Sequence, residues 1–311
     1  MSAARAVILA AAQNKWLKEH ASRYRFVRKS VSRFMPGESL DDAVAAAHQL
    51  HVRGLGTVFT HLGENIADAD EAESVVAHYL KVLERIRTEN LATEISVKPT
   101  QLGLDLSPSL CAQNLRRLLA AEYPERTVWL DMESSPYVDA TLTLYRGLLA
   151  DHPNCGVCLQ AYLHRTPDDI AELMPRRPSI RLVKGAYREA VSIAMQEKQD
   201  IDARYLELAQ KLLAAQKAGR MRRAILATHD PRLIEQIKNL ATQEGIPRPQ
   251  AEVQMLYGIQ RELQQKLAAE GWKSSVLVAY GKHWYAWFMR RLAERPANLW
   301  LVLRNIGAAE G

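Results

Sequence analysis

Short apolar runs alternate with longer amphipathic stretches between residues 54 and 281. Each run is rich in β-branched and other apolar residues, as buried parallel strands are. The stretches between the runs, such as 71–90 and 201–219, carry apolar residues at helical spacing. Eight runs are present: GLGTVFTHL (54–62), TEISVKPT (93–100), TVWLDMES (127–134), GVCLQAY (156–162), IRLVKGAY (180–187), RAILATHD (223–230), AEVQMLYG (251–258) and SSVLVAYG (274–281). The pattern predicts eight strand-then-helix units.

Local signals mark where several of these helices begin and end. Ser107 precedes Pro108, and Asp230 precedes Pro231. A capping side chain followed by proline is typical of a helix start. Gly219 follows a helical stretch and suits a helix C-cap.

Eight such units in about 250 residues indicate an α/β fold of the (β/α)8 TIM-barrel type. A doubly wound open sheet is the competing fold. The count of eight and the lack of G-x-G-x-x-G after the first strand argue against it. We expect residues 1–50 to form an N-terminal helical arm outside the barrel, broken at MPGE (35–38). The barrel is then expected over residues 51–303, and a tail over 304–311.

The composition fits a soluble globular chain of 311 residues, with 48% hydrophobic and 24% charged residues. No apolar run approaches the length of a transmembrane segment, and MSAARAVILAAAQ at the start lacks a convincing cleavage site. Three cysteines are too few for a disulfide scaffold, so we expect a reducing cytoplasm.

The net charge of +6 comes mostly from basic residues scattered among acidic ones, which does not indicate nucleic acid as a partner. The exception is the basic, aromatic-interleaved segment 15–33. Such a helix can approach an anionic membrane surface, which leaves a peripheral location at the inner face of the membrane open. A helix packed on the main domain, with its charges in water, is the favoured interpretation.

Polar residues recur where the predicted strands end. They are Glu64, Lys98, Asp131, Gln160, Lys184, Thr228, His229, Gln254 and Tyr280. In a (β/α)8 barrel the carboxyl ends of the strands form the active face. Independent loop residues explain one or two of these positions but not their recurrence in each unit. We therefore expect an enzyme active site at this end of the barrel.

Two strand ends carry most of the candidate chemistry. In RLVKGAY (181–187), Arg181 can donate to an electron-rich ring, and Lys184 can pair with phosphate or form a Schiff base. Gly185 and Ala186 leave room for a large ligand beside the backbone. In ATHD (227–230), Thr228 and His229 precede a helix N-terminus, which is a common phosphate site.

A late helix, WYAWFMRRLAERP (284–296), places Arg290 and Arg291 side by side, with Glu294 about one turn beyond. Guanidinium groups among aromatics favour an anionic ligand, because a bidentate contact with a carboxylate is strong. A surface helix with an ordinary ion pair is the alternative. Asp131 needs a cationic partner, for which Lys98 or a late-helix arginine is available, and Tyr280 can bond an arginine while covering a substrate ring.

Neither a metal nor a redox disulfide is expected. Cys155 and Cys158 form a C-x-x-C at a strand entry, without a second pair. His48 and His51 lack an H-E-x-x-H context.

Together these residues resemble the proline dehydrogenase family over about residues 54–300. The resemblance rests on VKPTQLG, WLDMES, LQAYL, RLVKGAY, ATHD, QMLYG and AYGKHWYAWFMRRLAERP, in this order. It implies a distorted barrel that binds FAD at the strand carboxyl ends, with the last helix over the barrel mouth. The short arm and small size are similar to the monofunctional bacterial form. Ala279 stands where the family often has proline, and Asp230 where it often has asparagine; Asp230 can instead cap the helix begun by Pro231.

The resemblance also implies roles for individual residues. Arg290, Arg291 and Lys98 would hold the carboxylate of L-proline, Glu294 would orient the arginines, and Tyr280 and Leu256 would close around the ring. Asp131 would orient the pocket's cations, and Arg181 would reach the flavin N5 region. FAD contacts are implied for Met132, Gln160, Arg181, Val183, Lys184, Gly185, Ala186, Tyr187, Thr228 and His229.

The implied reaction is hydride transfer from C5 of proline to flavin N5, which gives Δ1-pyrroline-5-carboxylate and begins proline catabolism. A membrane quinone is the implied electron acceptor, and a pyrroline-5-carboxylate dehydrogenase is a possible partner. A Schiff-base aldolase on the same barrel, with Lys184 or Lys98 as nucleophile, is the alternative activity. A non-enzymatic barrel that binds a partner through its basic arm is the alternative from another class.

Overall fold

Eight parallel strands form a closed barrel in the order in which they occur along the chain. The computed structural model describes residues 31–63, 66–285 and 287–289. The strands are β1 (Gly56–His61), β2 (Thr93–Val97), β3 (Val128–Leu130), β4 (Cys155–Gln160), β5 (Ser179–Val183), β6 (Arg223–Ala227), β7 (Glu252–Leu256) and β8 (Lys273–Tyr280). The barrel closes where β1 pairs with β8, with Gly56 opposite Ser275 and His61 opposite Tyr280. The eight predicted strands and the (β/α)8 fold are confirmed.

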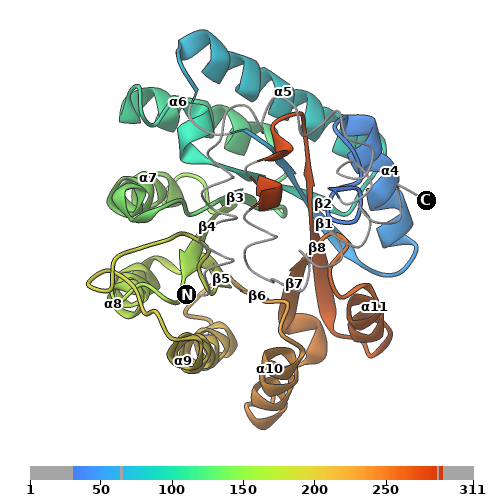
Figure 1. Cartoon of the computed structure of the whole chain (residues 1–311), viewed down its shortest axis with the longest axis vertical. Helices are drawn as coiled ribbons and strands as arrows, with labels where there is room; N and C mark the ends of the chain where they lie inside the picture. The colour runs from blue at the N-terminus through green and yellow to red at the C-terminus, as the bar shows by residue number, and fades with distance from the viewer. Residues whose placement is uncertain (1–30, 64–65, 286, 290–311) are drawn as a thin grey trace, which may run out of the picture.

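A layer of helices surrounds the strands (Figure 1). Its α-helices in the described residues are α4 (Leu40–His51), α5 (Ala69–Thr88), α6 (Pro108–Ala121), α7 (Val138–Leu149), α8 (Thr166–Leu173), α9 (Lys198–Lys217), α10 (Pro231–Gln243) and α11 (Arg261–Ala269). Short 3-10 helices are η2 (Pro99–Leu102), η3 (Ser135–Tyr137), η4 (Met174–Arg176) and η5 (Arg248–Gln250). No helix in these parts of the chain is long and apolar enough to cross a membrane.

The predicted helix boundaries are confirmed where the sequence carries capping signals. The Ser107 side chain accepts a hydrogen bond from the backbone of Leu110 at the start of α6. Asp230 caps α10 by accepting from the backbone N–H of Arg232 at 3.1 Å. Gly219, just after α9, has a positive φ of 69°, the conformation in which glycine ends a helix without strain.

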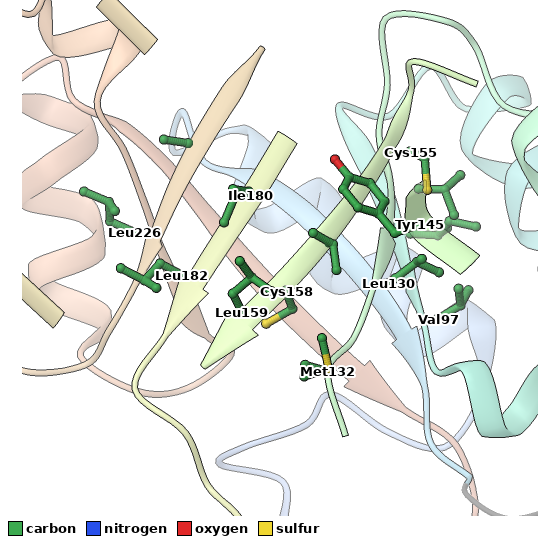
Figure 2. Packing of buried hydrophobic residues seen from close by; sticks show 14 of the residues in the cluster. Val97, Leu130, Met132, Tyr145, Cys155, Cys158, Leu159, Ile180, Leu182 and Leu226 are labelled. Atoms are coloured by element: carbon green, nitrogen blue, oxygen red, sulfur yellow. The ribbon is translucent and has the colours of Figure 1, made fainter. Parts of the chain in front are cut away.

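The main core lies between the barrel and the helices. Alternate strand residues face outward into it, among them Val97, Leu130, Ile180, Leu182 and Leu226 (Figure 2). These side chains are fully buried. Because burial of apolar side chains is the largest stabilising contribution to folding, this layer fixes the strands. The opposite face of each strand points into the barrel and is free to carry polar residues.

Helix α4 packs against the barrel and is not part of an external arm. Its residues Ala43, Val44, Ala47 and Leu50 belong to the same buried core as the outward-facing residues of the strands. The predicted boundary at residue 50 is therefore misplaced, because an Ala-rich helix alone does not reveal which surface it covers. Residues 1–30 and 304–311 lie outside the described residues, so the rest of the arm and the tail stay predictions.

The described start of the late helix lies at the barrel mouth. Its aromatic side chains belong to one buried cluster with residues at the carboxyl ends of β7 and β8 and with residues near the start of the described chain. The members are Trp284, Tyr285, Trp287, Phe288, Leu256, Ala279, Val31, Met35 and Leu62. The indole N–H of Trp284 donates to Glu38 Oε1 at 2.9 Å, which ties the start of this helix to the segment before α4. The rest of this helix lies outside the described residues, so its course across the mouth stays a prediction.

Candidate active site

Two cations share one carboxylate just inside the carboxyl end of the barrel. Arg181 of β5 contacts Asp131, which follows β3, and donates to Ser96 Oγ at 2.9 Å. Ser96 Oγ in turn donates to Asp131 Oδ1 at 2.8 Å. The ammonium of Lys98, the residue after β2, lies 3.8 Å from the other Asp131 oxygen. The structure thus brings together three of the predicted site residues, and adds Ser96, which sequence reasoning missed because a small strand hydroxyl gives no pattern of its own.

Both cations are buried, so solvent screens their charges only weakly. Arg181 is 2% exposed and Lys98 is 7% exposed. Burial alone lowers the pKa of Arg181, but the charge of Asp131 outweighs it and holds this pKa above its usual value. Around Asp131, two positive groups therefore meet one negative group in surroundings poor in water. An excess of positive charge at one carboxylate favours an anionic ligand group beside it.

Gln160 offers an unused acceptor at the same end of the barrel. Its side-chain amide donates to the backbone carbonyls of Met132 at 3.4 Å and Glu133 at 3.3 Å. Its Oε1 atom is buried and has no hydrogen-bond partner in the described structure. A buried acceptor of this kind is costly unless a ligand N–H or O–H reaches it. Gln160 is therefore placed to bind a ligand donor.

Gly185 leaves the backbone flat beside Tyr162. Its φ is +118°, and a Cβ at this position would lie 2.2 Å from the Tyr162 ring. Only glycine fits here, because the Tyr162 ring occupies the space beside the backbone, and the ligand approach expected at this turn stays a prediction.

Lys184 lies in a compact cluster of alternating charges. It contacts Asp202 of α9 and lies 3.9 Å from Asp230. Lys198 contacts Asp202 and lies 3.3 Å from Asp230. Asp202 is about 20 residues from Lys184 and belongs to an ordinary amphipathic helix, so nothing in the sequence signals this pairing. The cluster holds Lys184 in place at the ends of β5 and β6.

Thr228 and His229 follow β6 beside this cluster. Thr228 Oγ1 accepts from the backbone N–H of Asp230 at 3.2 Å, and the carbonyl of His229 accepts from Gln260 at 3.4 Å. The expected turn into α10 is present, so these two side chains lie next to a helix N-terminus.

Tyr280 does not line the mouth, contrary to the sequence expectation. Its hydroxyl bonds His78 Nε2 of α5 at 2.8 Å, and its ring packs edge-on against Phe59. Side chains on a strand alternate, so Tyr280 faces the helix layer together with Val278, while Ala279 faces the mouth. The expected contact of Tyr280 with a substrate ring is therefore wrong, whereas Leu256 does lie at the mouth.

Two neighbouring histidine rings beside Tyr280 predict a pH dependence of the free energy of unfolding. The rings of His61 and His78 have centroids 4.3 Å apart. Burial, then the charges of His78, His283 and Lys98, lowers the pKa of His61 to about 4. The unfolded chain therefore binds a proton at pH values where the folded chain does not. We expect the free energy of unfolding to fall as the pH is lowered from about 6.5 towards 4, and His61→Asn to reduce that fall. Urea unfolding at pH 7 and pH 5 measures it; an equal loss in the variant would contradict this assignment.

The three cysteines are free and buried. Burial raises the pKa of Cys111 and of Cys155 to about 12, and it also raises the pKa of Cys158. Cys155 and Cys158 are three residues apart on β4, so the alternation of a strand places their side chains on opposite faces. Thiols of this kind are poor nucleophiles and poor metal ligands. In the described ranges no group of three or more potential ligands could hold a metal ion.

Arg290, Arg291 and Glu294, together with Glu64, lie outside the described residues. Their predicted roles therefore stay predictions. The remaining predicted contacts, Met132, Val183, Ala186 and Tyr187, lie at or just beyond the carboxyl ends of β3 and β5.

The fold and the mouth define a (β/α)8 barrel with two buried cations on one carboxylate at the carboxyl ends of its strands, where the active sites of barrel enzymes lie. Comparison with known proteins is consistent with this class. The family model described as proline dehydrogenase matches residues 43–302. Proline dehydrogenase 1 of Bacillus subtilis (strain 168) is 38% identical over 303 residues, which are 97% of this chain and 98% of that protein. Proline dehydrogenase of Deinococcus radiodurans is 36% identical over 282 residues, 89% of each chain.

The chain belongs to the proline dehydrogenase family. Its activity is the oxidation of proline, the first step of proline catabolism. Among solved structures, proline utilization A (PutA) of Bdellovibrio bacteriovorus inactivated by N-propargylglycine matches with a TM-score of 0.79 at 22% identity. That match covers 93% of this chain and 36% of the PutA chain, so it speaks for the barrel fold.

Proposed function

We propose that the protein oxidises L-proline to Δ1-pyrroline-5-carboxylate with FAD as its cofactor. The observation that carries this proposal is the buried pair of cations, Lys98 and Arg181, on the single carboxylate Asp131. Two cations on one carboxylate suit both a substrate carboxylate and an electron-rich ring that gains negative charge when it is reduced. FAD, when bound, supplies the acceptor for the hydride that leaves C5 of proline.

The residues at the mouth fit such a cofactor. The unused Gln160 oxygen suits a ring N–H of that cofactor. Lys184, Thr228 and His229, next to the start of α10, are candidates for the phosphates. We assign Met132, Gln160, Arg181, Val183, Lys184, Gly185, Ala186, Tyr187, Thr228 and His229 to FAD binding.

The remaining residues act on the substrate. Arg290, Arg291 and Lys98 hold the carboxylate of proline, Glu294 orients the arginines, and Leu256 covers the apolar ring. Asp131 fixes Lys98 and Arg181, and it is not needed as a base. The ring nitrogen must be neutral when hydride leaves, and cations around the substrate lower its basicity. The protein's contribution is therefore positioning and electrostatics.

A direct experiment separates this proposal from a Schiff-base aldolase. Lys98 and Lys184 both lie beside carboxylates, which stabilise a charged ammonium, whereas a Schiff-base lysine attacks as the uncharged amine. We expect the purified protein with L-proline and a quinone to form Δ1-pyrroline-5-carboxylate, and borohydride with a carbonyl substrate to leave both lysines unmodified. Borohydride trapping on Lys98 or Lys184, without proline turnover, would overturn the proposal.

Electron transfer is proposed to run to a membrane quinone. Three buried free thiols fit a reducing compartment, so we propose a cytoplasmic location at or near the inner membrane surface. The basic segment 15–33 is the candidate for approaching that surface. Deletion of residues 1–35 should weaken co-sedimentation with anionic liposomes; unchanged binding would remove the segment from the account.

The product is proposed to pass to a pyrroline-5-carboxylate dehydrogenase. The bifunctional protein PutA of Escherichia coli is 27% identical to this chain over 323 residues, which are 24% of its own length. The name bifunctional describes that protein; for this chain the partner enzyme is a proposal.

A further inference from the structure

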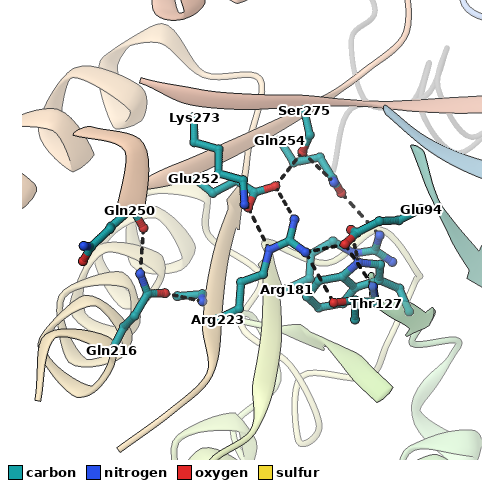
Figure 3. Close-up of polar contacts among 12 residues, drawn as sticks. Glu94, Thr127, Arg181, Gln216, Arg223, Gln250, Glu252, Gln254, Lys273 and Ser275 are labelled. Atoms are coloured by element: carbon teal, nitrogen blue, oxygen red, sulfur yellow. Dashed lines mark hydrogen bonds and ion pairs between the residues drawn. The ribbon is translucent and has the colours of Figure 1, made fainter. Parts of the chain in front are cut away.

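A chain of buried hydrogen bonds runs inside the barrel from Arg181 away from the mouth (Figure 3). The Oε1 atom of Gln254, on β7, accepts from Arg181 Nη1 at 3.3 Å. The amide of Gln254 donates to Ser275 Oγ, on β8, at 3.0 Å, and Ser275 Oγ donates to Glu252 Oε1 at 3.0 Å. Gln254 is 2% exposed, Ser275 is 5% exposed and Glu252 is 1% exposed. The chain therefore has no access to bulk water.

The far end of this chain is an ionised carboxylate. Arg223 donates to both Glu252 oxygens at 2.8 Å, and the ammonium of Lys273 lies 3.1 Å away. Burial alone raises the pKa of Glu252, but the charges of Arg223 and Lys273 outweigh it and hold this pKa below its usual value. An ionised carboxylate only accepts hydrogen bonds. Glu252 therefore fixes the direction of the neighbouring bond.

The direction of the Ser275–Glu252 hydrogen bond determines the direction of each following hydrogen bond towards the active site. The Ser275 hydroxyl has a single proton, which it donates in the hydrogen bond to Glu252. The hydroxyl oxygen must therefore accept a hydrogen bond from Gln254. The Gln254 NH2 group is then committed to Ser275, and its oxygen must face Arg181. Without the Ser275 hydroxyl, the side-chain amide of Gln254 can flip by about 180°. Its NH2 group would then point at an N–H of the Arg181 guanidinium. Two donors would face each other in a buried site, at a cost.

We propose that Ser275 and Gln254 are positioning residues that orient the Arg181 guanidinium towards the mouth. Asp131 and Ser96 hold the Nη2 side of Arg181, and Gln254 holds the Nη1 side. A planar guanidinium held at both ends keeps one orientation. This inference rests on the proposed function, in which Arg181 lies beside the FAD ring and sets the charge near it.

The test compares Ser275→Ala with Ser274→Ala. Ser274 is the neighbouring serine on β8, is 3% exposed, and its buried hydroxyl has no hydrogen-bond partner among the described residues, so it is a matched control. We expect Ser275→Ala to lower kcat about tenfold with little change in KM for L-proline, the equivalent of one lost hydrogen bond in the transition state. We also expect a more negative midpoint potential of the bound flavin, because a less ordered cation stabilises the reduced ring less. Ser274→Ala should match the wild type in both.

Two further variants keep the test decisive. Ser275→Thr retains the hydroxyl and should recover most of the potential and of kcat. If the Ser275→Ala protein does not fold, Gln254→Met provides the same test, and we expect it to show the lower kcat and the more negative flavin potential. A Ser275→Ala protein with the kcat and flavin potential of the Ser274→Ala control would overturn the positioning role alone. A wild-type protein that holds no flavin, or a flavin that L-proline does not reduce, would overturn the proposed function and this inference with it.

Discussion

Replacement of Arg223 by methionine is expected to lower the free energy of unfolding by about 3–5 kcal/mol. Arg223 lies inside the barrel, between Glu94 at 2.5 Å and Glu252 at 2.8 Å (Figure 3). Its guanidinium also lies 5.5 Å from the ring centre of Trp129, a fully buried side chain. Methionine keeps much of the volume but leaves the two carboxylates with less compensating charge. Removal of one partner of a buried ion pair destabilises a protein far more than replacement of both partners by apolar residues.

Urea-induced unfolding at pH 7 measures this loss. Arg117→Met is the matched control, because Arg117 pairs with Glu73 through two hydrogen bonds on the protein surface. Solvent screens that pair, so the control should unfold close to the wild type. Adding Glu252→Gln to Arg223→Met should recover part of the stability, since it removes a buried negative charge that has lost one of its two cationic partners. An Arg223→Met protein as stable as the control would contradict the role of the interior ion cluster.

The second large effect is expected at the substrate carboxylate. Arg291→Ala should weaken L-proline binding by about 2–5 kcal/mol while FAD content stays unchanged. Arg291 lies beyond the described residues, so the argument comes from the sequence: two adjacent arginines follow an aromatic stretch whose described part lies at the barrel mouth. A bidentate contact between guanidinium and carboxylate is directional, and its loss leaves the substrate anion with only Arg290 and Lys98 as proposed partners.

Steady-state kinetics and flavin absorbance together measure this effect. Arg232→Ala is a suitable control, because Arg232 is an exposed residue at the start of α10. It should leave KM for proline unchanged. If Arg291→Ala loses FAD and keeps a normal KM, the arginine belongs to the cofactor site and the substrate role is wrong.

The strand pattern was the most predictive part of the sequence. All eight apolar runs contain a strand, and Ser107, Asp230 and Gly219 mark helix ends as expected. These signals are local, because capping bonds and burial of a short run depend on neighbouring residues. The cluster of Lys98, Asp131 and Arg181 was also predictable in outline, since parallel strands bring their carboxyl ends to one mouth.

The errors arose where tertiary packing decides. Tyr280 looked like a mouth residue because it ends a strand, but strand alternation turns it towards His78 in the helix layer. Helix α4 looked like an arm because nothing local shows that it covers β1 and β8. Asp202 was missed because its partner Lys184 is on another element. In each case the sequence shows the residue type and not its neighbour in space.

The most direct measurement is the visible absorption spectrum of the purified protein before and after L-proline is added without oxygen. We expect the absorption of an oxidised, bound flavin, which bleaches on addition of L-proline and returns when a quinone is supplied. A colourless protein, or a flavin band that L-proline leaves unchanged, would contradict it.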